Sequence, residues 1–246
     1  MARGFGSTDG TATTDKIVTG HTTLNTLTSW CQWVWLTGAG GGDLGRIFDK
    51  DGAGATTGKR FLYYQNGTPV LGLGVSWTGA QGAWTIAAPA TGSWHHLCVT
   101  YDGGSVNNDP IFYLNNTTPT VTELGPGSGT LETNTGVYHI GNRSDDLRNL
   151  NGRVAEFAVW EGTILTAGNV ASLYNSGAGA RADAIGVTPT TYWRLLGTAS
   201  PEPNEVGGGS TGTVTGALQQ AHPFTLSALS NKLIGLLGQP IHRHGC

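Results

Sequence analysis

SWHHLCVTYDGGSVNNDPIFYLN, residues 93–115, is the stretch of sequence that decides the fold. Residues 94–101 alternate with a period of two, which fits a strand whose two faces meet different surroundings. Residues 102–110 are rich in Asp, Gly and Asn, which are typical turn residues, and Pro110 can open an edge strand. A second apolar run, residues 111–115, follows directly. The stretch therefore predicts two strands joined by a polar turn.

The composition favours a neutral, turn-rich β protein. Charged residues make up only 12% of the 246 residues, and the chain contains 40 glycines and 8 tryptophans. The 13 basic and 16 acidic residues predict no strong electrostatic field, and therefore no nucleic-acid partner. We expect no membrane span, because no run approaches about 20 apolar residues. The amino terminus lacks the apolar segment of a signal peptide, which favours synthesis and folding in a cytoplasm.

Strand signals recur at short intervals along the rest of the chain, which favours a sandwich or a barrel. Trp30 and Trp33 lie on opposite faces of one such run, so we expect it to be a central strand packed on both sides. The predicted strands are residues 16–19, 29–36, 45–49, 60–65, 70–77, 83–87, 94–101, 111–115, 120–124, 137–141 and 152–160.

One short helix is predicted after these strands, over residues 167–174. Thr166 is a suitable N-cap, and Gly177 is a suitable stop signal. Val170 and Leu173 share one face of this helix, and packing of that face must stabilise so short a segment.

Three linked motifs suggest a family. The first is WHHLCVTYD at residues 94–102, and the second is YHIGNR at residues 138–143 with LNGRVAEFAVW at residues 150–160. The third is the helix that ends in LYNSG at residues 173–177. In order and spacing they resemble laminin-G-like and pentraxin-like domains, which are concanavalin A-like sandwiches. The resemblance implies an all-β fold, a two-sheet antiparallel jelly-roll sandwich with one short helix, whose usual role is binding rather than catalysis.

The carboxyl-terminal part departs from the family order. TYWRLL at residues 191–196 and GTVTG at residues 212–216 resemble elements that usually open these domains. We therefore expect residues 190–216 to complete the sheets, giving a sandwich over residues 1–225. Residues 226–246 then form an extension, interpreted as a docking arm for a partner or, alternatively, as a tail packed on its own domain or frayed.

The three cysteines leave two interpretations open. Cys31 and Cys98 fall inside predicted strands, where a free cysteine commonly acts as a small buried apolar residue, and this is the expected state. A disulfide between Cys31 and Cys98 is the alternative.

Acidic and amide side chains gather in three loops. The resemblance implies a calcium ion at a loop rim, with glycans bound there, and calcium needs six to eight oxygen ligands. Asp and Asn are also the commonest turn residues, and ordinary turn chemistry is the favoured interpretation of these loops. The candidate calcium ligands are Asp43, Asp49 and Asp51, then Asn107, Asn108 and Asp109, and finally Asn142, Asp145 and Asp146.

Trp77 and Trp84 flank a glycine-rich segment that is predicted to form a hairpin near a loop tip. Exposed rings there would form a stacking platform for sugars, whereas buried rings would fill the core of the sandwich. Both interpretations remain open at the level of sequence.

No motif indicates catalysis. The glutamates are scattered rather than paired on one strand, as glycosidases of this architecture require, and we expect no enzyme activity. The opening MARGFG, the DKIVT strand and the YWRLL segment resemble phage and environmental viral structural proteins.

We therefore expect a decoration protein of a virus particle, made in the host cytoplasm. Its expected partners are a capsid protein or further copies of itself, and cell-surface glycans. The alternative is an extracellular, calcium-dependent bacterial lectin or carbohydrate-binding module.

Overall fold

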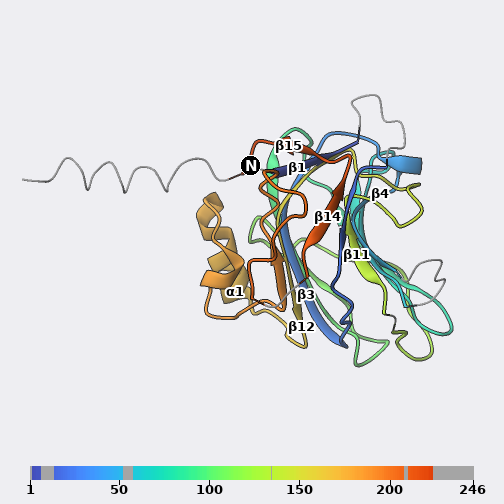
Figure 1. Cartoon of the computed structure of the whole chain (residues 1–246). Helices are drawn as coiled ribbons and strands as arrows, with labels where there is room; N and C mark the ends of the chain where they lie inside the picture. Colours follow the sequence, from blue (N-terminus) through green and yellow to red (C-terminus); the bar gives the residue numbers. More distant parts are fainter. Residues whose placement is uncertain (1, 7–13, 52–57, 134, 208–209, 224–246) are drawn as a thin grey trace, which may run out of the picture.

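Two antiparallel β-sheets packed face to face make up the computed structural model of the chain (Figure 1). The structure describes residues 2–6, 14–51, 58–133, 135–207 and 210–223. The predicted extension, residues 226–246, lies outside the described residues. The jelly-roll sandwich that the sequence predicted is confirmed.

Sheet A has the strand order β15, β1, β12, β3, β8, β9, and β13 also pairs with β12. Its strands are β1 (Ala2–Phe5), β3 (Leu27–Leu36), β8 (Trp94–Asp102), β9 (Ile111–Leu114), β12 (Gly152–Glu161), β13 (Thr191–Trp193) and β15 (Leu218–Gln220).

Sheet B has the order β10, β7, β6, β5, β4, β11, β2, β14. Its strands are β2 (Lys16–Thr19), β4 (Gly45–Asp51), β5 (Arg60–Gln65), β6 (Val70–Val75), β7 (Gly82–Ala87), β10 (Thr122–Gly125), β11 (Val137–Ile140) and β14 (Gly212–Thr215). Three short 3-10 turns, η1 (Gly41–Asp43), η2 (Asn175–Gly177) and η3 (Ala182–Ala184), connect the remaining elements.

Every strand predicted from the sequence is present, with ends shifted by a few residues. The two strands predicted from residues 93–115 are β8 and β9, which pair in a register that places Leu97 opposite Leu114. β1 and β15 were not predicted, because each is very short and neither alternates clearly.

Aromatic side chains fill the space between the sheets. Trp30 of β3 is fully buried, and its ring centroid lies 5.5 Å from that of Phe48 on the opposite sheet. Its indole N–H donates to the hydroxyl of Tyr138 at 2.9 Å, so the polar edge of the ring is satisfied inside the core. Phe157 contacts both Phe48 and Tyr138, at centroid distances of 5.6 and 5.8 Å.

The predicted central strand, β3, is confirmed by its place between β12 and β8. The predicted helix is α1 (Ala167–Tyr174), which lies on the outer face of sheet A, away from sheet B (Figure 1). The Thr166 hydroxyl accepts from the Asn169 N–H, as an N-cap should. The helix ends at Tyr174 with the left-handed Asn175 as its C-cap, and Gly177, the predicted stop signal, also has a positive φ.

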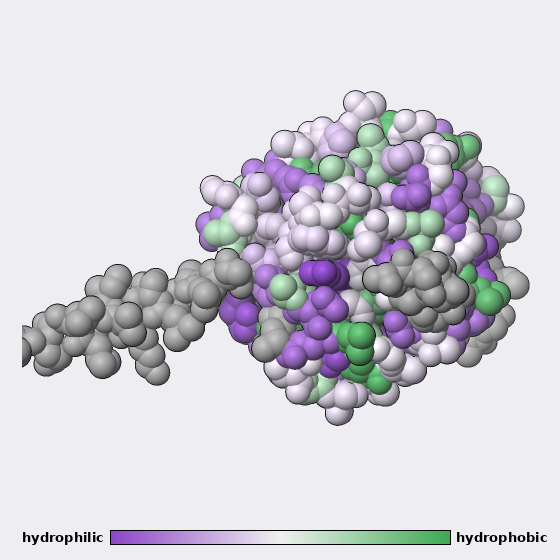
Figure 2. Space-filling view, turned by 90° about the horizontal axis from the view of Figure 1, so that it is seen from above, coloured by the Kyte–Doolittle hydropathy of each residue, from purple (hydrophilic) through white to green (hydrophobic). Residues whose placement is uncertain are grey.

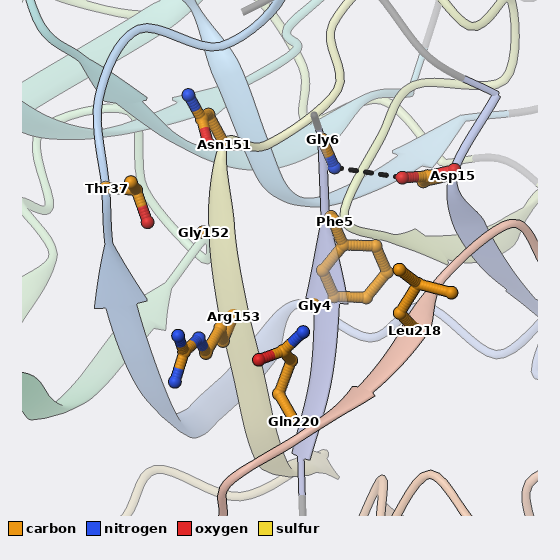
Figure 3. A pocket seen from close by; sticks show the side chains of 10 residues that line it. All are labelled: Gly4, Phe5, Gly6, Asp15, Thr37, Asn151, Gly152, Arg153, Leu218 and Gln220. Atoms are coloured by element: carbon orange, nitrogen blue, oxygen red, sulfur yellow. Dashed lines mark hydrogen bonds between the residues drawn. The ribbon is translucent and has the colours of Figure 1, made fainter. Parts of the chain in front are cut away.

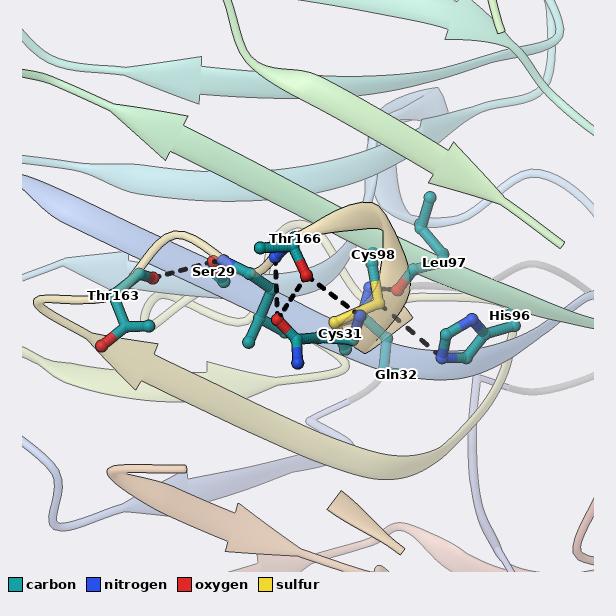
Figure 4. The surroundings of a disulfide bond; sticks show 10 residues. Ser29, Cys31, Gln32, His96, Leu97, Cys98, Thr163 and Thr166 are labelled. Atoms are coloured by element: carbon teal, nitrogen blue, oxygen red, sulfur yellow. Dashed lines mark hydrogen bonds between the residues drawn. A yellow bond between two sulfur atoms is a disulfide. The ribbon is translucent and has the colours of Figure 1, made fainter. Parts of the chain in front are cut away.

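A disulfide joins Cys31 to Cys98, so the expectation of two free cysteines was wrong (Figure 4). The register of β3 on β8 places the two residues directly opposite each other, with Cα atoms 4.1 Å apart. Both point to the outer face of sheet A, where Leu173 and Val170 of α1 cover them. The register, and with it the pairing, is a tertiary property that residue spacing does not reveal.

The two ends of the described chain meet on sheet A. The Arg3 guanidinium of β1 is buried, and its Nε donates to the Glu202 carboxylate at 2.7 Å. A second nitrogen of Arg3 donates to the Ala217 carbonyl at 2.9 Å. β15 then pairs with β1. The amino-terminal strand is thus held between β12 and the carboxyl-terminal segment.

The molecular surface seen in Figure 2 is mostly polar or neutral. Apolar side chains on this face occur in small separate groups rather than in one continuous patch (Figure 2). This agrees with the low charge and the high content of small residues in the sequence.

Replacement of both disulfide cysteines, Cys31→Ala with Cys98→Ala, should lower the free energy of unfolding by roughly 4 kcal/mol, since the bond closes a loop with a sequence separation of 67 residues. Denaturant titration with and without dithiothreitol measures this loss. Reductant should destabilise the wild type and leave the double variant unchanged. An unfolding midpoint of the wild type that does not respond to reductant would contradict the assignment.

The stability should fall in weak acid because of His96, which lies under α1 beside Tyr174, with Nε2 3.7 Å from the Cys98 sulfur. Desolvation lowers the pKa of His96 to about 3, so the folded protein keeps this imidazole neutral. In the unfolded chain it takes up a proton below about pH 6.5, so folding stability is lost as the pH falls from 6.5 towards 3. The loss attributable to His96 by pH 5 is up to about 2 kcal/mol. His96→Gln should flatten this part of the stability profile, and equal slopes for variant and wild type would refute it.

Candidate functional site

A continuous row of residues crosses the outer face of sheet A on five neighbouring strands. Strand register places Leu218 of β15 opposite Gly4 of β1, Gly4 opposite Arg153 of β12, and Arg153 opposite Trp35 of β3. Trp35 in turn lies opposite Trp94 of β8. Directly opposed residues point to the same face of a sheet, so this row forms one surface.

The aromatic end of the row is half-buried rather than covered. The rings of Trp35 and Trp94 meet edge to face, with centroids 5.9 Å apart. The Arg153 guanidinium lies over the Trp35 ring, 4.7 Å from its centroid, which is a cation–π contact. Trp33, two residues earlier on β3, is covered by Tyr174 of α1, whereas Trp35 and Trp94 remain partly accessible.

A pocket of about 150 Å³ lies beside Gly4 and Arg153 of the row (Figure 3). Arg153, which lies over Trp35, connects this pocket with the aromatic end. The pocket exists because Gly4 contributes no side chain to the row. A Cβ atom at Gly4 would lie 2.6 Å from Cγ of Gln220, whose amide points towards Arg153 in Figure 3. Asp15 lies at the other end of the pocket, beyond Phe5, and accepts from the Gly6 N–H at 3.0 Å. The lining residues are Gly4, Phe5, Gly6, Asp15, Thr37, Asn151, Gly152, Arg153, Leu218 and Gln220.

Several polar groups around this pocket have no hydrogen-bond partner among the residues that the structure describes. They are the guanidinium of Arg153, the side-chain amides of Gln220 and Asn151, the hydroxyl of Thr37 and the indole N–H groups of Trp35 and Trp94. We call these six residues the Arg153 site. It combines partly exposed ring surface with several donors and acceptors, an arrangement suited to a ligand that is apolar on one face and rich in hydroxyl groups.

A second cavity, of about 190 Å³, lies on the outer face of sheet B. The rings of Phe61 and Tyr63 lie over Gly74 and Gly72, where a Cβ atom would come within 2.2 and 2.3 Å of them. Its cation, Arg46, is buried over the Phe61 ring and donates to the Asp49 carboxylate at 2.9 Å. Burial lowers the pKa of Arg46, and Asp49 opposes that shift. Because its cation is already paired and its rings are nearly covered, this cavity offers a ligand less than the Arg153 site does.

The first predicted calcium loop is used for structural contacts. The Asp43 carboxylate accepts from the backbone N–H groups of Asn66 and Gly67. Asp49 is fully buried beside Arg46. The side chain of Asp51 is outside the described residues, although its backbone pairs with Val137.

The second loop is used in a similar way. Asp109 accepts from the indole N–H of Trp84 at 2.7 Å, and the Asn108 amide donates to the Asp102 carbonyl at 3.0 Å. The Asn107 N–H donates to the Ser105 hydroxyl at 3.2 Å.

In the third loop, the side-chain carbonyl of the buried Asn142 accepts from the N–H groups of Arg143 and Arg148. Asp145 pairs with Arg143, whose hydrogen bonds lower the pKa of that carboxyl group, and Asp146 pairs with Lys16 at 2.6 Å.

Several oxygen atoms of these loops already accept hydrogen bonds from cationic side chains or N–H groups. Over the described ranges of the chain, no group of three or more His, Cys, Asp or Glu side chains is arranged to hold a metal ion. Calcium binding therefore stays a prediction.

Trp77 and Trp84 are core residues, so the interpretation of an exposed stacking platform does not hold for them. Trp84 is fully buried and packs against Tyr101 at a centroid distance of 5.4 Å. Trp77 is 7% exposed, and its backbone forms an isolated antiparallel β-bridge with that of Leu131. The glycines near these residues let other chain segments close over the rings: a Cβ atom at Gly127 would lie 2.6 Å from Trp77.

The Arg153 site was not predicted from the sequence. Trp35 carried a usable signal, since it shares the outward face with Trp33 but falls nearer the strand end. The pairing of Gly4 with Arg153 and Leu218 unites segments from the two ends of the chain, and no local pattern predicts it.

The fold and the site together define a lectin-like β-sandwich. A family model described as the concanavalin A-like lectin/glucanases superfamily matches residues 5–171. The chain belongs to this superfamily. The matched range includes Trp35, Trp94 and Arg153, whereas Gln220 lies beyond it.

Two solved structures resemble this chain over most of its length. One, a protein of Bacteroides ovatus provisionally named as carbohydrate-binding, has a TM-score of 0.60 and 16% identity, covering 89% of this chain and 60% of that one. The other is a heptameric SAP-like pentraxin of Limulus polyphemus, with a TM-score of 0.56, 16% identity and coverages of 87% and 95%. At this identity the likeness shows the fold alone.

A third similar structure is the enzymatically active domain of tailspike protein 2 of bacteriophage CBA120. It has a TM-score of 0.51 and 14% identity, covering 73% of this chain and 28% of that one. The fold is therefore shared with an enzyme as well as with binding proteins. This chain spans less than two thirds of the Bacteroides protein and of the tailspike domain.

No curated protein sequence matches the chain. Among the described residues, no helix is long and apolar enough to cross a membrane.

Proposed function

We propose that the protein binds carbohydrate on the outer face of sheet A, at the Arg153 site. The observation that carries this proposal is that two half-buried tryptophans, Trp35 and Trp94, share one sheet face with a pocket lined by the Arg153 guanidinium and the amides of Gln220 and Asn151, for which the described residues supply no hydrogen-bond partner. Membership of a lectin-like superfamily supports it.

The physical argument rests on the two-sided nature of a sugar ring. Its C–H face is apolar and packs on an aromatic ring, while its hydroxyl groups need hydrogen bonds once water is displaced. Trp35 and Trp94 supply the ring surface. Gln220 and Asn151 supply planar amides that donate and accept at once, which matches the dual character of a hydroxyl group.

The site is also preorganised. Trp35, Trp94, Arg153 and Gln220 stand on paired β-strands, Thr37 and Asn151 lie directly beside strand ends, and Arg153 contacts the Trp35 ring through the cation–π interaction. Little side-chain freedom is lost when such a site binds a ligand, so more of the contact energy appears as affinity.

A matched pair of glutamines tests the site. Gln220 lies in the Arg153 site, and Gln81 lies in the sheet B cavity. On an oligosaccharide array followed by calorimetry, Gln220→Ala and Trp35→Ala should weaken binding at least about tenfold, whereas Gln81→Ala should not change it. Gly4→Ser should also weaken binding, because its side chain would enter the pocket without removing any donor.

Binding that is lost in Gln81→Ala and kept in Gln220→Ala would move the site to sheet B. Loss of binding in a chelator would favour the predicted calcium loops instead. A wild-type protein that binds no oligosaccharide on the array would refute the proposal.

The biological setting is a separate proposal, with the two alternatives drawn from the sequence. In the first, the sandwich faces outward on a virus particle, attached to a capsid protein or to further copies of itself. In the second, it is an extracellular carbohydrate-binding module or lectin of a bacterium.

Self-association separates these settings. Light scattering of the full chain beside a version that ends at Phe224 measures it directly. The virion setting predicts that the full chain assembles and that the shorter one is a folded monomer. A monomer in both cases would count against a self-association arm and favour the bacterial setting.

A further inference from the structure

Arg153 differs from the other arginines that the structure describes. Each of the others donates a hydrogen bond to a carboxylate or to a backbone carbonyl, namely Arg3, Arg46, Arg60, Arg143, Arg148, Arg181 and Arg194. For Arg153 the one contact within the described residues is the ring of Trp35. Its five N–H donors are therefore available to a ligand.

The cation–π contact favours one position of this guanidinium, although none of the described residues forms an ion pair with it. Its central carbon lies 4.7 Å from the centroid of the Trp35 ring, and strand β12 holds its backbone between β1 and β3. A planar guanidinium held in this way presents a fork of two parallel donors, which matches the two oxygens of a carboxylate.

The pocket is electrically asymmetric. Arg153 stands at one end, and Asp15 stands at the other, beyond Phe5 (Figure 3). A ligand with negative charge along its whole length would meet Asp15 unfavourably. A ligand with one carboxylate and several hydroxyl groups meets favourable partners at both ends.

We infer that the ligand of the Arg153 site is an acidic sugar, bound through its carboxylate by the Arg153 guanidinium. This inference rests on the proposed carbohydrate-binding function of the same site. The carboxylate accepts two hydrogen bonds from Arg153, the sugar ring packs on Trp35 and Trp94, and hydroxyl groups reach the amides and Asp15. No covalent step is involved.

The test uses oligosaccharide pairs that differ only in the oxidation state of one carbon. Suitable pairs are cellobiose with cellobiouronic acid and a galactose disaccharide with its galacturonic acid counterpart. Lactose and sialyllactose form a further pair, which differs by a whole acidic sugar. At least one acidic member should bind the wild type about tenfold more tightly than its neutral partner, since charge-assisted hydrogen bonds are roughly twice as strong as neutral ones.

Three variants separate the effect of the positive charge of Arg153 from the effect of its two parallel N–H donors. Arg153→Gln should abolish the preference for the acidic member. Arg153→Lys, which keeps the charge but not the fork, should reduce that preference. Lys59→Gln is the matched control, because it removes one positive charge on the side of sheet B and should leave the preference unchanged. The measured quantity is the ratio of the two affinities, which a general loss of folding would not change selectively.

Each outcome has a definite meaning. Equal or tighter binding of the neutral members, still sensitive to Trp35→Ala, would overturn the acidic-sugar inference and leave the proposed function intact. A heparin-derived sulfated oligosaccharide that binds most tightly, and through Arg153, would overturn it in favour of a polyanion. Absence of binding to every saccharide would refute the proposed function and this inference together.

Discussion

The buried ion pair between Arg3 and Glu202 is the interaction on which the Arg153 site depends. Both groups are almost inaccessible to water, and they come from opposite ends of the described chain. Removing one partner of a buried pair leaves an uncompensated charge, at a cost of about 3–5 kcal/mol. The pair therefore strongly favours closure of the amino-terminal strand against the carboxyl-terminal segment. That closure places β1 beside β12 and allows β15 to pair with β1.

The Arg153 site follows from this closure. β12 and β3 alone would present Arg153 and Trp35 on an open sheet face. The addition of β1 brings Gly4 into the row, and β15 adds Gln220 as the far wall of the pocket. On the other half of the same face, α1 covers Trp33 and the disulfide. The helix thus stabilises one part of sheet A, while the part that carries Trp35 and Trp94 remains accessible for binding.

Much of the fold could be predicted from the sequence because its signals are local. The alternation at residues 94–101, the turn at residues 102–110 and the N-cap at Thr166 each involve neighbouring residues, and each corresponds to an observed element. The disulfide was missed because Cys31 and Cys98 meet only through strand register. The site was missed for a related reason. Acidic turn residues are conspicuous in a sequence, but here they bind arginine, lysine and backbone N–H groups. The unpartnered Arg153 looks like any other charged residue in a strand until its neighbours are known.

The proposed function requires that the partly exposed tryptophans and Arg153 on sheet A contact a sugar. The most direct measurement is a nitrogen-15 NMR titration of the protein with the oligosaccharide that binds best on the array, following the indole N–H and arginine Nε–H signals. Sugar binding at the Arg153 site should give saturable shifts for Trp35, Trp94 and Arg153, while the signals of Trp30 and Trp84, whose indole N–H groups donate to Tyr138 and Asp109, should not move. Shifts concentrated on Arg46 and the neighbouring residues of sheet B, with Arg153 unchanged, would contradict it.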